Sequence, residues 1–129
     1  MNEELKVVIK CRIDKADETL SDAKLLFDSE KYSSCINRLY YASFYSLNAL
    51  LLYNNLNSKT HKGVRNLFFI EFINKGTVAK EWASFYSLLF NSRMECDYKD
   101  FYVPNPETVK EWLDKCCQFS DLIKGLIKL

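Results

Sequence analysis

Apolar side chains recur at steps of three and four over the first 29 residues, with Glu, Lys and Asp filling the positions between them. This spacing places the apolar residues on one stripe of a helix and the charged residues on the opposite face. The sequence therefore predicts an amphipathic helix over about residues 3–29. Its buried stripe is expected to consist of Leu5, Ile9, Ile13, Ala16, Leu20, Ala23 and Phe27.

The next segment, about residues 33–53, differs because its apolar and small side chains go most of the way round a helix. A helix of this kind is contacted on several sides, so we expect it at the centre of the fold. Its small residues would let neighbouring helices approach closely. One narrow strip stays polar or amphipathic and is a possible wall of a binding site; it consists of Asn37, Tyr41, Tyr45 and Asn48.

A third, shorter helix is expected over about residues 61–74, where apolar residues again recur at helical spacing. Ser58 or Thr60 is placed to cap its start. Gly76 suits the left-handed backbone position that often follows a helix, so it marks the end. The apolar positions of this helix are Val64, Leu67, Phe68, Ile70 and Phe72.

Two more helices complete the pattern. Thr77 can cap a helix over about residues 78–98, and residues 99–103 then form a linker. Asn105 followed by Pro106 is a cap with proline at the first helical position, which opens a fifth helix that runs to the C-terminus. The expected buried faces are Val78, Trp82, Phe85, Leu89 and Cys96 on the fourth helix, and Val109, Trp112 or Leu113, Cys116, Phe119, Ile123 and Ile127 on the fifth.

Composition favours helices over strands, because only three Gly and two Pro interrupt 129 residues and no strand pattern appears. We therefore expect an all-α fold, an up-and-down bundle of four to five helices that forms a single domain over residues 1–129. No apolar run approaches the roughly 20 residues of a membrane-spanning helix, and the first residues do not resemble a signal peptide. We accordingly expect a soluble, cytoplasmic protein without a membrane partner.

Charge and cysteine content argue against several classes of function. The formal net charge is +1, which disfavours bulk electrostatic attraction to nucleic acid but leaves room for a local basic patch. The five cysteines are odd in number and form no Cys-x-x-Cys or Cys/His cluster, so reduced core thiols are favoured over disulfides or zinc. With one His and scattered carboxylates, we expect no metal site and no cofactor.

The segment from Asn91 to Tyr98 carries the most distinctive chemistry. The guanidinium of Arg93 is permanently charged and can donate two hydrogen bonds to one phosphate. The carboxylate of Asp97, one helical turn further on, can orient this guanidinium. Tyr98 adds a phenol at the predicted helix end. The plainer alternative is an ion pair between Arg93 and Asp97 at the end of the bundle.

A second candidate is the stretch Lys59-Thr60-His61-Lys62-Gly63. It would place cations, a hydroxyl and the sole histidine at the start of a helix, where backbone N–H groups favour anions. His61 is also the only residue whose unperturbed side-chain pKa lies near neutrality. The alternative is an ordinary surface turn with a solvent-facing His61.

The polar strip of the central helix is the third candidate. Tyr41 and Tyr45, with Asn37 and Arg38 beside them, could stack on nucleotide bases. Tyrosines at helical spacing are more often part of a core or an interface, with the hydroxyl at the edge.

Together these motifs resemble those of the HEPN superfamily of small helical bundles. The resemblance covers about residues 30–98 and follows the order and rough spacing of one prokaryotic branch. Its motifs here are Arg38-Leu-Tyr-Tyr-Ala-Ser-Phe44, Lys59-Thr-His-Lys-Gly63, the Phe-x-x-x-Phe-Ile tract from Phe68 to Ile73, and Arg93-Met-Glu-Cys-Asp-Tyr98.

The resemblance implies a bundle, commonly homodimeric, that binds nucleotide or RNA. Many members are toxin-side ribonucleases encoded beside a minimal nucleotidyltransferase that acts as antitoxin. Active members carry Arg, then four to six residues, then His near the end of a long helix; Arg93 matches the Arg, whereas Tyr98 stands five residues on and no His follows. The usual acid–base partner is therefore missing, unless folding brings His61 beside Arg93.

Three functions stay open at this point. In the first, a cleft binds a phosphate-bearing ligand, nucleotide or RNA, without standard nuclease activity, and the chain is one half of a toxin–antitoxin-like pair. In the second, a metal-independent endoribonuclease uses Arg93 with His61 or Tyr98. In the third, the chain is a non-catalytic dimeric interaction module. The expected ligand-binding residues are Asn37, Tyr41, Lys59, Thr60, His61, Arg93, Asp97 and Tyr98.

Overall fold

The computed structural model describes residues 1–99 and 102–129, and all regular structure within them is helical. The all-α prediction is therefore confirmed. The elements are α1 (Glu3–Asp28), α2 (Tyr32–Tyr53), α3 (His61–Phe68), the short π-helix η1 (Phe69–Ile73), α4 (Lys80–Tyr98) and α5 (Pro106–Gly125). The predicted linker at 99–103 falls partly on residues 100–101, which lie outside the described residues.

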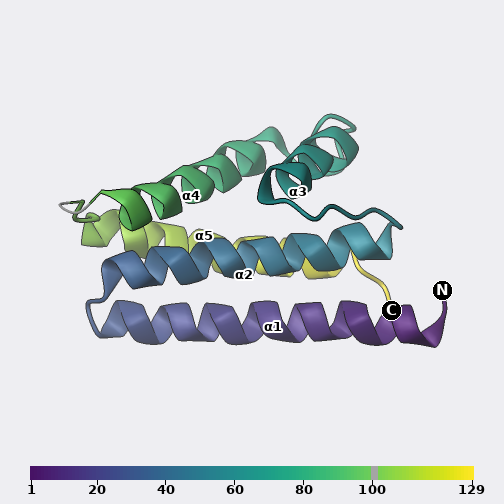
Figure 1. Ribbon diagram of the computed structural model, residues 1–129, viewed down its shortest axis with the longest axis horizontal. Coiled ribbons are helices and arrows are strands. Elements are labelled where there is room, and N and C mark those ends of the chain that lie inside the picture. Colours follow the sequence, from purple (N-terminus) through teal and green to yellow (C-terminus); the bar gives the residue numbers. More distant parts are fainter. Residues whose placement is uncertain (100–101) are drawn as a thin grey trace.

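The long helices lie up and down beside one another (Figure 1). α1 and α2 are antiparallel neighbours joined by a tight turn, in which Glu30 takes the left-handed conformation with φ 60°. α3 and α4 form a layer above α2, and α5 lies behind it. Within the described residues, no helix combines the length and apolar character needed to cross a membrane.

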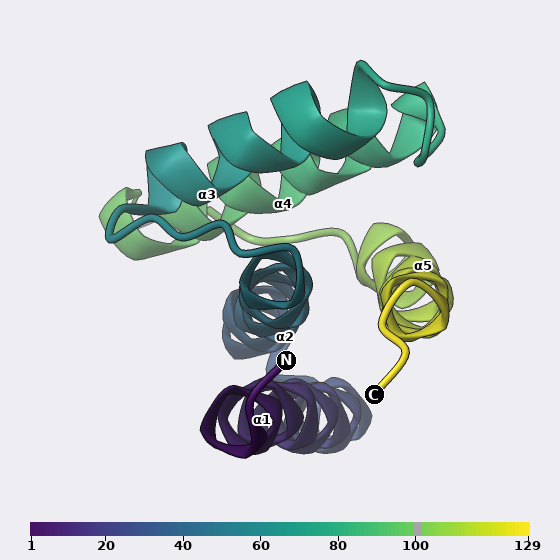
Figure 2. The same ribbon diagram turned by 90° about the vertical axis from the view of Figure 1, so that its right-hand side faces the viewer.

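α2 lies at the centre of the bundle, as its nearly all-apolar pattern predicts. Figure 2, which looks along α2, shows α1 below it, α3 and α4 above it, and α5 at one side. The opposite side of α2 is not covered by any helix of the described residues, and it faces the viewer in Figure 1. The fully buried side chains of α2 include Ile36, Leu39, Tyr40, Leu47 and Leu50.

The third helix is not uniform, although the spacing predicts one helix over 61–74. α3 ends after two turns and continues as the π-helical turn η1, whose end is marked by a hydrogen bond of 2.8 Å from the Asn74 N–H to the Phe69 carbonyl. The wider turn lets the adjacent residues Phe72 and Ile73 both reach the core. A regular α-helix would turn one of these two neighbours further away from it.

The fourth helix begins at Lys80, two residues later than predicted. Thr77 does not cap it; the N-cap residue is Ala79, which has no side-chain cap. Val78 explains the late start, because its side chain is buried and its N–H donates to the Phe72 carbonyl at 3.1 Å. A residue anchored to the preceding element in this way does not form the first turn of the next helix.

The fifth helix begins at its predicted cap and ends before the C-terminus. The side-chain oxygen of Asn105 accepts a hydrogen bond from the Glu107 N–H at 2.9 Å, so the cap is confirmed. Of the two predicted alternatives for the buried face, Leu113 is buried and Trp112 is only partly so. Ile127 lies beyond the helix and is half-buried, so it is not part of a continued helical stripe.

Candidate functional site

The uncovered side of α2 carries the polar strip that the sequence predicts. α1 borders this side along one edge and the α3–α4 layer borders it along the other (Figures 1 and 2). A side of a central helix that stays accessible is a natural place for a ligand. We call it the open side of α2 and define it by the half-buried residues Asn37, Arg38, Tyr41, Phe44, Tyr45 and Asn48.

The start of α3 is built as a compact turn. Thr60 is the N-cap, and its hydroxyl accepts a hydrogen bond from the Gly63 N–H at 2.9 Å. The hydroxyls of Ser58 and Thr60 press against Gly63, so a Cβ at this position would collide with both. The Thr and Gly of the Lys-Thr-His-x-Gly motif therefore shape the turn, and the turn fixes the position of His61.

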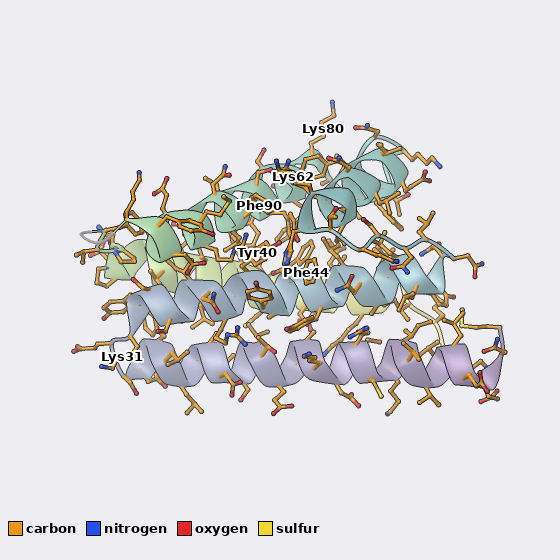
Figure 3. All side chains as sticks on the ribbon, viewed as in Figure 1. Lys31, Tyr40, Phe44, Lys62, Lys80 and Phe90 are labelled. Atoms are coloured by element: carbon orange, nitrogen blue, oxygen red, sulfur yellow. The ribbon has the colours of Figure 1, made fainter. Side chains whose placement is uncertain are left out.

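His61 is held by contacts with α2. Its ring stacks on Phe44 with centroids 4.3 Å apart, and its Nδ1 lies 2.7 Å from the Tyr40 hydroxyl. Because Nδ1 is occupied by Tyr40, Nε2 is the ring nitrogen left for a ligand. Figure 3 shows Tyr40 and Phe44 between α2 and the α3–α4 layer.

Arg93 of α4 contacts the same tyrosine. Its guanidinium carbon lies 4.4 Å from the centre of the Tyr40 ring, and its Nη1 donates to the Tyr41 hydroxyl at 3.3 Å. Its Nε is buried without a hydrogen-bond partner. The ion pair with Asp97 does not form, and among the described residues no carboxylate lies within 4 Å of Arg93. Folding thus brings His61 and Arg93 to one ring; Tyr40, Tyr41, His61 and Arg93 are called the central cluster below.

Burial sets the protonation states of the central cluster. Burial lowers the pKa of His61 below its ordinary value of 6.5, and the nearby charge of Arg93 lowers it further. Burial raises the pKa of Tyr40 above 10, against smaller opposing effects from Arg93 and from the adjacent Tyr86 hydroxyl. That hydroxyl is itself buried and has no hydrogen-bond partner of good geometry. At neutral pH the cluster therefore places the neutral imidazole of His61 and the neutral phenol of Tyr40 beside the guanidinium cation of Arg93.

Two more arginines flank the cluster. Arg38 donates from Nε and Nη2 to the Asn37 side-chain oxygen at 3.1 and 2.7 Å, and its guanidinium carbon lies 5.2 Å from the centre of the Tyr41 ring. The guanidinium carbon of Arg65 lies 4.7 Å from the centre of the Phe90 ring. All ion pairs within the described residues use lysines, so these guanidinium charges are packed on rings and not neutralised by carboxylates.

A cleft of about 480 Å³ opens where α2 begins and α4 ends. Its polar lining includes Asn37 and Arg38 of α2, Asp97 of α4 and two serines from the first turn of α2. The side-chain oxygen of Asn37 is engaged by Arg38, which leaves the amide nitrogen for a ligand. Tyr41, whose ring contacts both Arg38 and Arg93, joins this first cleft to the central cluster.

The fold brings together most of the predicted ligand-binding residues: Tyr41, His61 and Arg93 in the central cluster, and Asn37 and Asp97 in the first cleft. The others lie at the surface. Lys59 is exposed, and Thr60 uses its hydroxyl for the helix cap. Tyr98 is 79% exposed at the end of α4, so it does not share the environment of Arg93.

The sequence did not single out Tyr40 and Phe44 as site residues. Both fit the apolar pattern of α2, and Tyr40 is fully buried. Tyr40 belongs to the site because its hydroxyl reaches His61 and its ring contacts the Arg93 guanidinium. One signal was available, because a tyrosine in a strongly apolar setting needs a hydrogen-bond partner for its hydroxyl, and a lone histidine is a suitable one.

The site gathers hydrogen-bond donors and not metal ligands. Within the part of the chain that the structure describes, no group of three or more His, Cys, Asp or Glu side chains could hold a metal ion. A guanidinium, an imidazole and phenols can instead donate to the oxygens of a phosphate.

The bundle and the order of its motifs define a small helical domain of the HEPN type. The HEPN domain family matches residues 9–126. A UPF0332 protein of Thermotoga maritima is 41% identical over 128 residues, which cover 99% of this chain and 96% of that protein. A protein of Methanocaldococcus jannaschii named "Putative toxin MJ0605" is 34% identical over 128 residues, 99% of this chain and 95% of its own length. The chain belongs to the HEPN family, as its motifs predict.

Proposed function

We propose that this protein binds a phosphate-bearing ligand, a nucleotide or RNA, at the open side of α2, with Arg93 as the principal contact to the phosphate. The observation that carries this proposal is the partly buried guanidinium of Arg93, which has no carboxylate partner among the described residues. Burying a cation without a counter-ion is costly, whereas a phosphate oxygen would form charge-assisted hydrogen bonds with it. Nε2 of His61 and the hydroxyl of Tyr41 supply neighbouring contacts.

Titration of 5′-nucleotides and short RNA onto wild type and Arg93→Ala tests this proposal. We expect binding to weaken about 10- to 100-fold, because a hydrogen bond to a charged group contributes about 1.5–3 kcal/mol. The matched control is Lys110→Ala, which removes one positive charge from an exposed position on α5. Equal affinities for wild type and Arg93→Ala would contradict the proposal.

The same proposal holds that the standard nuclease mechanism of the family is not used. Tyr98 stands five residues after Arg93, where active members carry His. Its side chain is largely exposed, and a phenol is a weaker general base than the imidazole that it replaces.

A second candidate function is a metal-independent endoribonuclease, favoured by the contacts of His61 and Arg93 with the same Tyr40 ring. In this reaction the ribose 2′-oxygen attacks phosphorus, the bond to the 5′-oxygen breaks, and the 5′-oxygen takes up a proton. The neutral imidazole of His61 would accept the 2′-hydroxyl proton, and Arg93 would stabilise the charge on the phosphate oxygens.

Cleavage of a labelled RNA in the presence of EDTA distinguishes the two candidates. An endoribonuclease predicts activity in wild type that is lost in Arg93→Ala and in His61→Ala. Tyr98→Phe separates the roles of the two proton carriers, because it should leave the activity intact if His61 acts. Wild-type activity no higher than that of Arg93→Ala rejects catalysis.

We further propose that the protein forms a homodimer and acts in a toxin–antitoxin-like pair with a partner of the nucleotidyltransferase fold. Membership of the HEPN family and the names of two Methanocaldococcus jannaschii relatives, both called putative toxins, support this. Light scattering measures the mass in solution, and co-purification with the product of a neighbouring nucleotidyltransferase gene tests the pair. A monomer at high concentration that captures no such partner would contradict it. A dimer that captures the partner but binds neither nucleotide nor RNA would be an interaction module.

A further inference from the structure

A second cleft, of about 340 Å³, lies on the open side of α2 near the C-terminal end of that helix. α1 contributes Val8 and Arg12 to its walls, and the loop before α3 contributes Asn57 and Ser58. None of these residues belongs to the predicted site or to the central cluster. The lining residues from α2 are Phe44, Tyr45, Asn48 and Leu52.

The lining of the second cleft combines aromatic rings, amides and the cation of Arg12, and a second cation, Lys15, packs on one of these rings. The Lys15 ammonium lies 4.6 Å from the centre of the Tyr45 ring, and Arg12 makes no ion pair within the described residues. The side-chain amides of Asn48 and Asn57 can hydrogen-bond to the edge of a base. No carboxylate lines the cleft. Rings on which bases stack, with cations beside them, are the means by which proteins bind single-stranded nucleic acid.

The second cleft adjoins the central cluster directly. Phe44 connects the two, because its ring lines the cleft and also stacks on His61 of the central cluster. The ring of Tyr45 lies 6.0 Å from that of Tyr41, measured between centroids. A ligand with its phosphate at the central cluster would therefore have a neighbouring nucleotide within reach of the second cleft.

The length of this surface exceeds one nucleotide. Between Asn37 in the first cleft and Asn48 in the second, α2 rises roughly 16 Å. Successive nucleotides of a stacked strand rise about 3.4 Å each. We propose that the open side of α2 binds a single-stranded RNA segment of several nucleotides, with a phosphate at the central cluster and an adjoining nucleotide stacked in the second cleft. This inference rests on the proposed function, because it requires phosphate binding at Arg93, and it selects oligonucleotide RNA over a free nucleotide.

Affinities for AMP and for an eight-nucleotide oligoadenylate test the inference. We expect the octanucleotide to bind at least tenfold more tightly than AMP. Tyr45→Ala should weaken the octanucleotide about 5- to 100-fold, the effect of losing one base–aromatic stack. Arg12→Ala changes an exposed side chain, so the fold is retained; it should weaken the octanucleotide severalfold and reduce the salt dependence of binding. Arg12→Ala should leave the AMP affinity unchanged, and Lys110→Ala is again the charge control.

The outcomes separate this inference from the proposed function. Equal affinities for AMP and the octanucleotide, or octanucleotide binding that neither Tyr45→Ala nor Arg12→Ala weakens, would overturn the inference while phosphate binding at Arg93 stands. An RNA hairpin that binds as tightly as the single strand would overturn it too. Affinities for AMP and the octanucleotide that are both insensitive to Arg93→Ala would instead overturn the proposed function.

Discussion

The two sides of α2 differ in what their residues contribute. The side toward α1 and α5, called the closed side here, is apolar or small: Leu39, Ala42, Ser43, Ser46 and Leu50. Its small residues let α1 and α5 approach until no water fits between the helices. Cys116 of α5 lies 3.6 Å from the Ser43 hydroxyl, and burial raises the pKa of this thiol to about 12, so it stays protonated. Everything on this side serves packing.

The open side of α2 has the opposite character. The rings of Tyr41 and Tyr45 are half-buried and carry the cations of Arg38, Arg93 and Lys15 on or near their faces. Cation–ring contacts at such positions contribute only about 0.5–1 kcal/mol each, less than a well-packed apolar side chain. Residues that stabilise a fold weakly, and whose charges stay without counter-ions, are expected at functional sites. The closed side therefore supplies the packing that stabilises the fold, and the open side is where we propose that the ligand binds.

The largest effect should come from a cavity on the closed side. Leu39 is fully buried, so Leu39→Ala should lower the free energy of unfolding by about 2–5 kcal/mol. Asn48→Ala on the open side should change it by no more than about 0.5 kcal/mol and should weaken binding of the octanucleotide instead. Urea denaturation followed by circular dichroism measures both. A loss of stability in Asn48→Ala as large as in Leu39→Ala would break the comparison.

A smaller effect, on ligand affinity, is expected from Arg93→Lys, which keeps the positive charge on the open side and removes the bidentate guanidinium. An ammonium group is a point charge and cannot bind a phosphate bidentately. Affinity for AMP should fall severalfold, less than in Arg93→Ala, because the charge is kept while the bidentate geometry is lost. Fluorescence competition with a labelled octanucleotide measures it. Full wild-type affinity in Arg93→Lys would mean that the open side attracts phosphate by charge alone.

The turn before α3 contributes both to the stability of the fold and to the site, because it caps a helix and also positions His61. Thr60→Ala removes a cap and should cost about 1 kcal/mol of unfolding free energy, with weaker AMP binding as the turn loosens. Thr77→Ala is the matched control, because Thr77 precedes α4 without capping it, and its stability should match wild type. If Thr77→Ala proved as costly as Thr60→Ala, the assignment of the two threonines would be wrong.

Much of the fold could be predicted because its signals are local. The apolar stripe of α1, the apolar circumference of α2 and the cap at Asn105 each depend on residues close together in the chain. The start of α4 could not be predicted, because Val78 is held by a carbonyl of η1 and not by its sequence neighbours. The π-helical turn was missed for a similar reason: it places Phe72 and Ile73 against a core that the local pattern does not reveal.

The chemistry of individual site residues could be predicted from the sequence, but their arrangement in space could not. Arg93 and His61 stood out chemically, yet their meeting depends on how α3 and α4 cross α2. Helical spacing made Asp97 a plausible partner for Arg93; the rings of Tyr40 and Tyr41 draw the guanidinium elsewhere. Spacing specifies which side chains are neighbours on one helix, whereas the direction of a long side chain is decided by the helices packed against it.

The smallest predicted effect concerns His61, through the pH dependence of stability. The pKa of His61 in the folded protein lies below 6.5, the value expected for the unfolded chain. Between these two pKa values the unfolded state binds more protons, so stability falls as the pH drops from about 7 through the folded-state pKa. His61→Gln should remove this contribution. Urea midpoints from pH 5 to 8, taken as the difference between wild type and His61→Gln, measure the slope.

The affinity for a phosphate ligand should change with pH in the opposite direction to the stability, and His61 should again be the residue responsible. A phosphate oxygen at Nε2 favours the imidazolium, so affinity should rise as the pH falls through the same range. The dinucleotide ApA is a suitable probe, because its phosphodiester does not titrate there, and His61→Gln again supplies the reference. Opposite slopes would show that His61 is held in a form suited to packing and changes its charge to meet the ligand. Slopes of the same sign would mean that His61 does not contact the phosphate and that Arg93 and the tyrosines hold it without the imidazole.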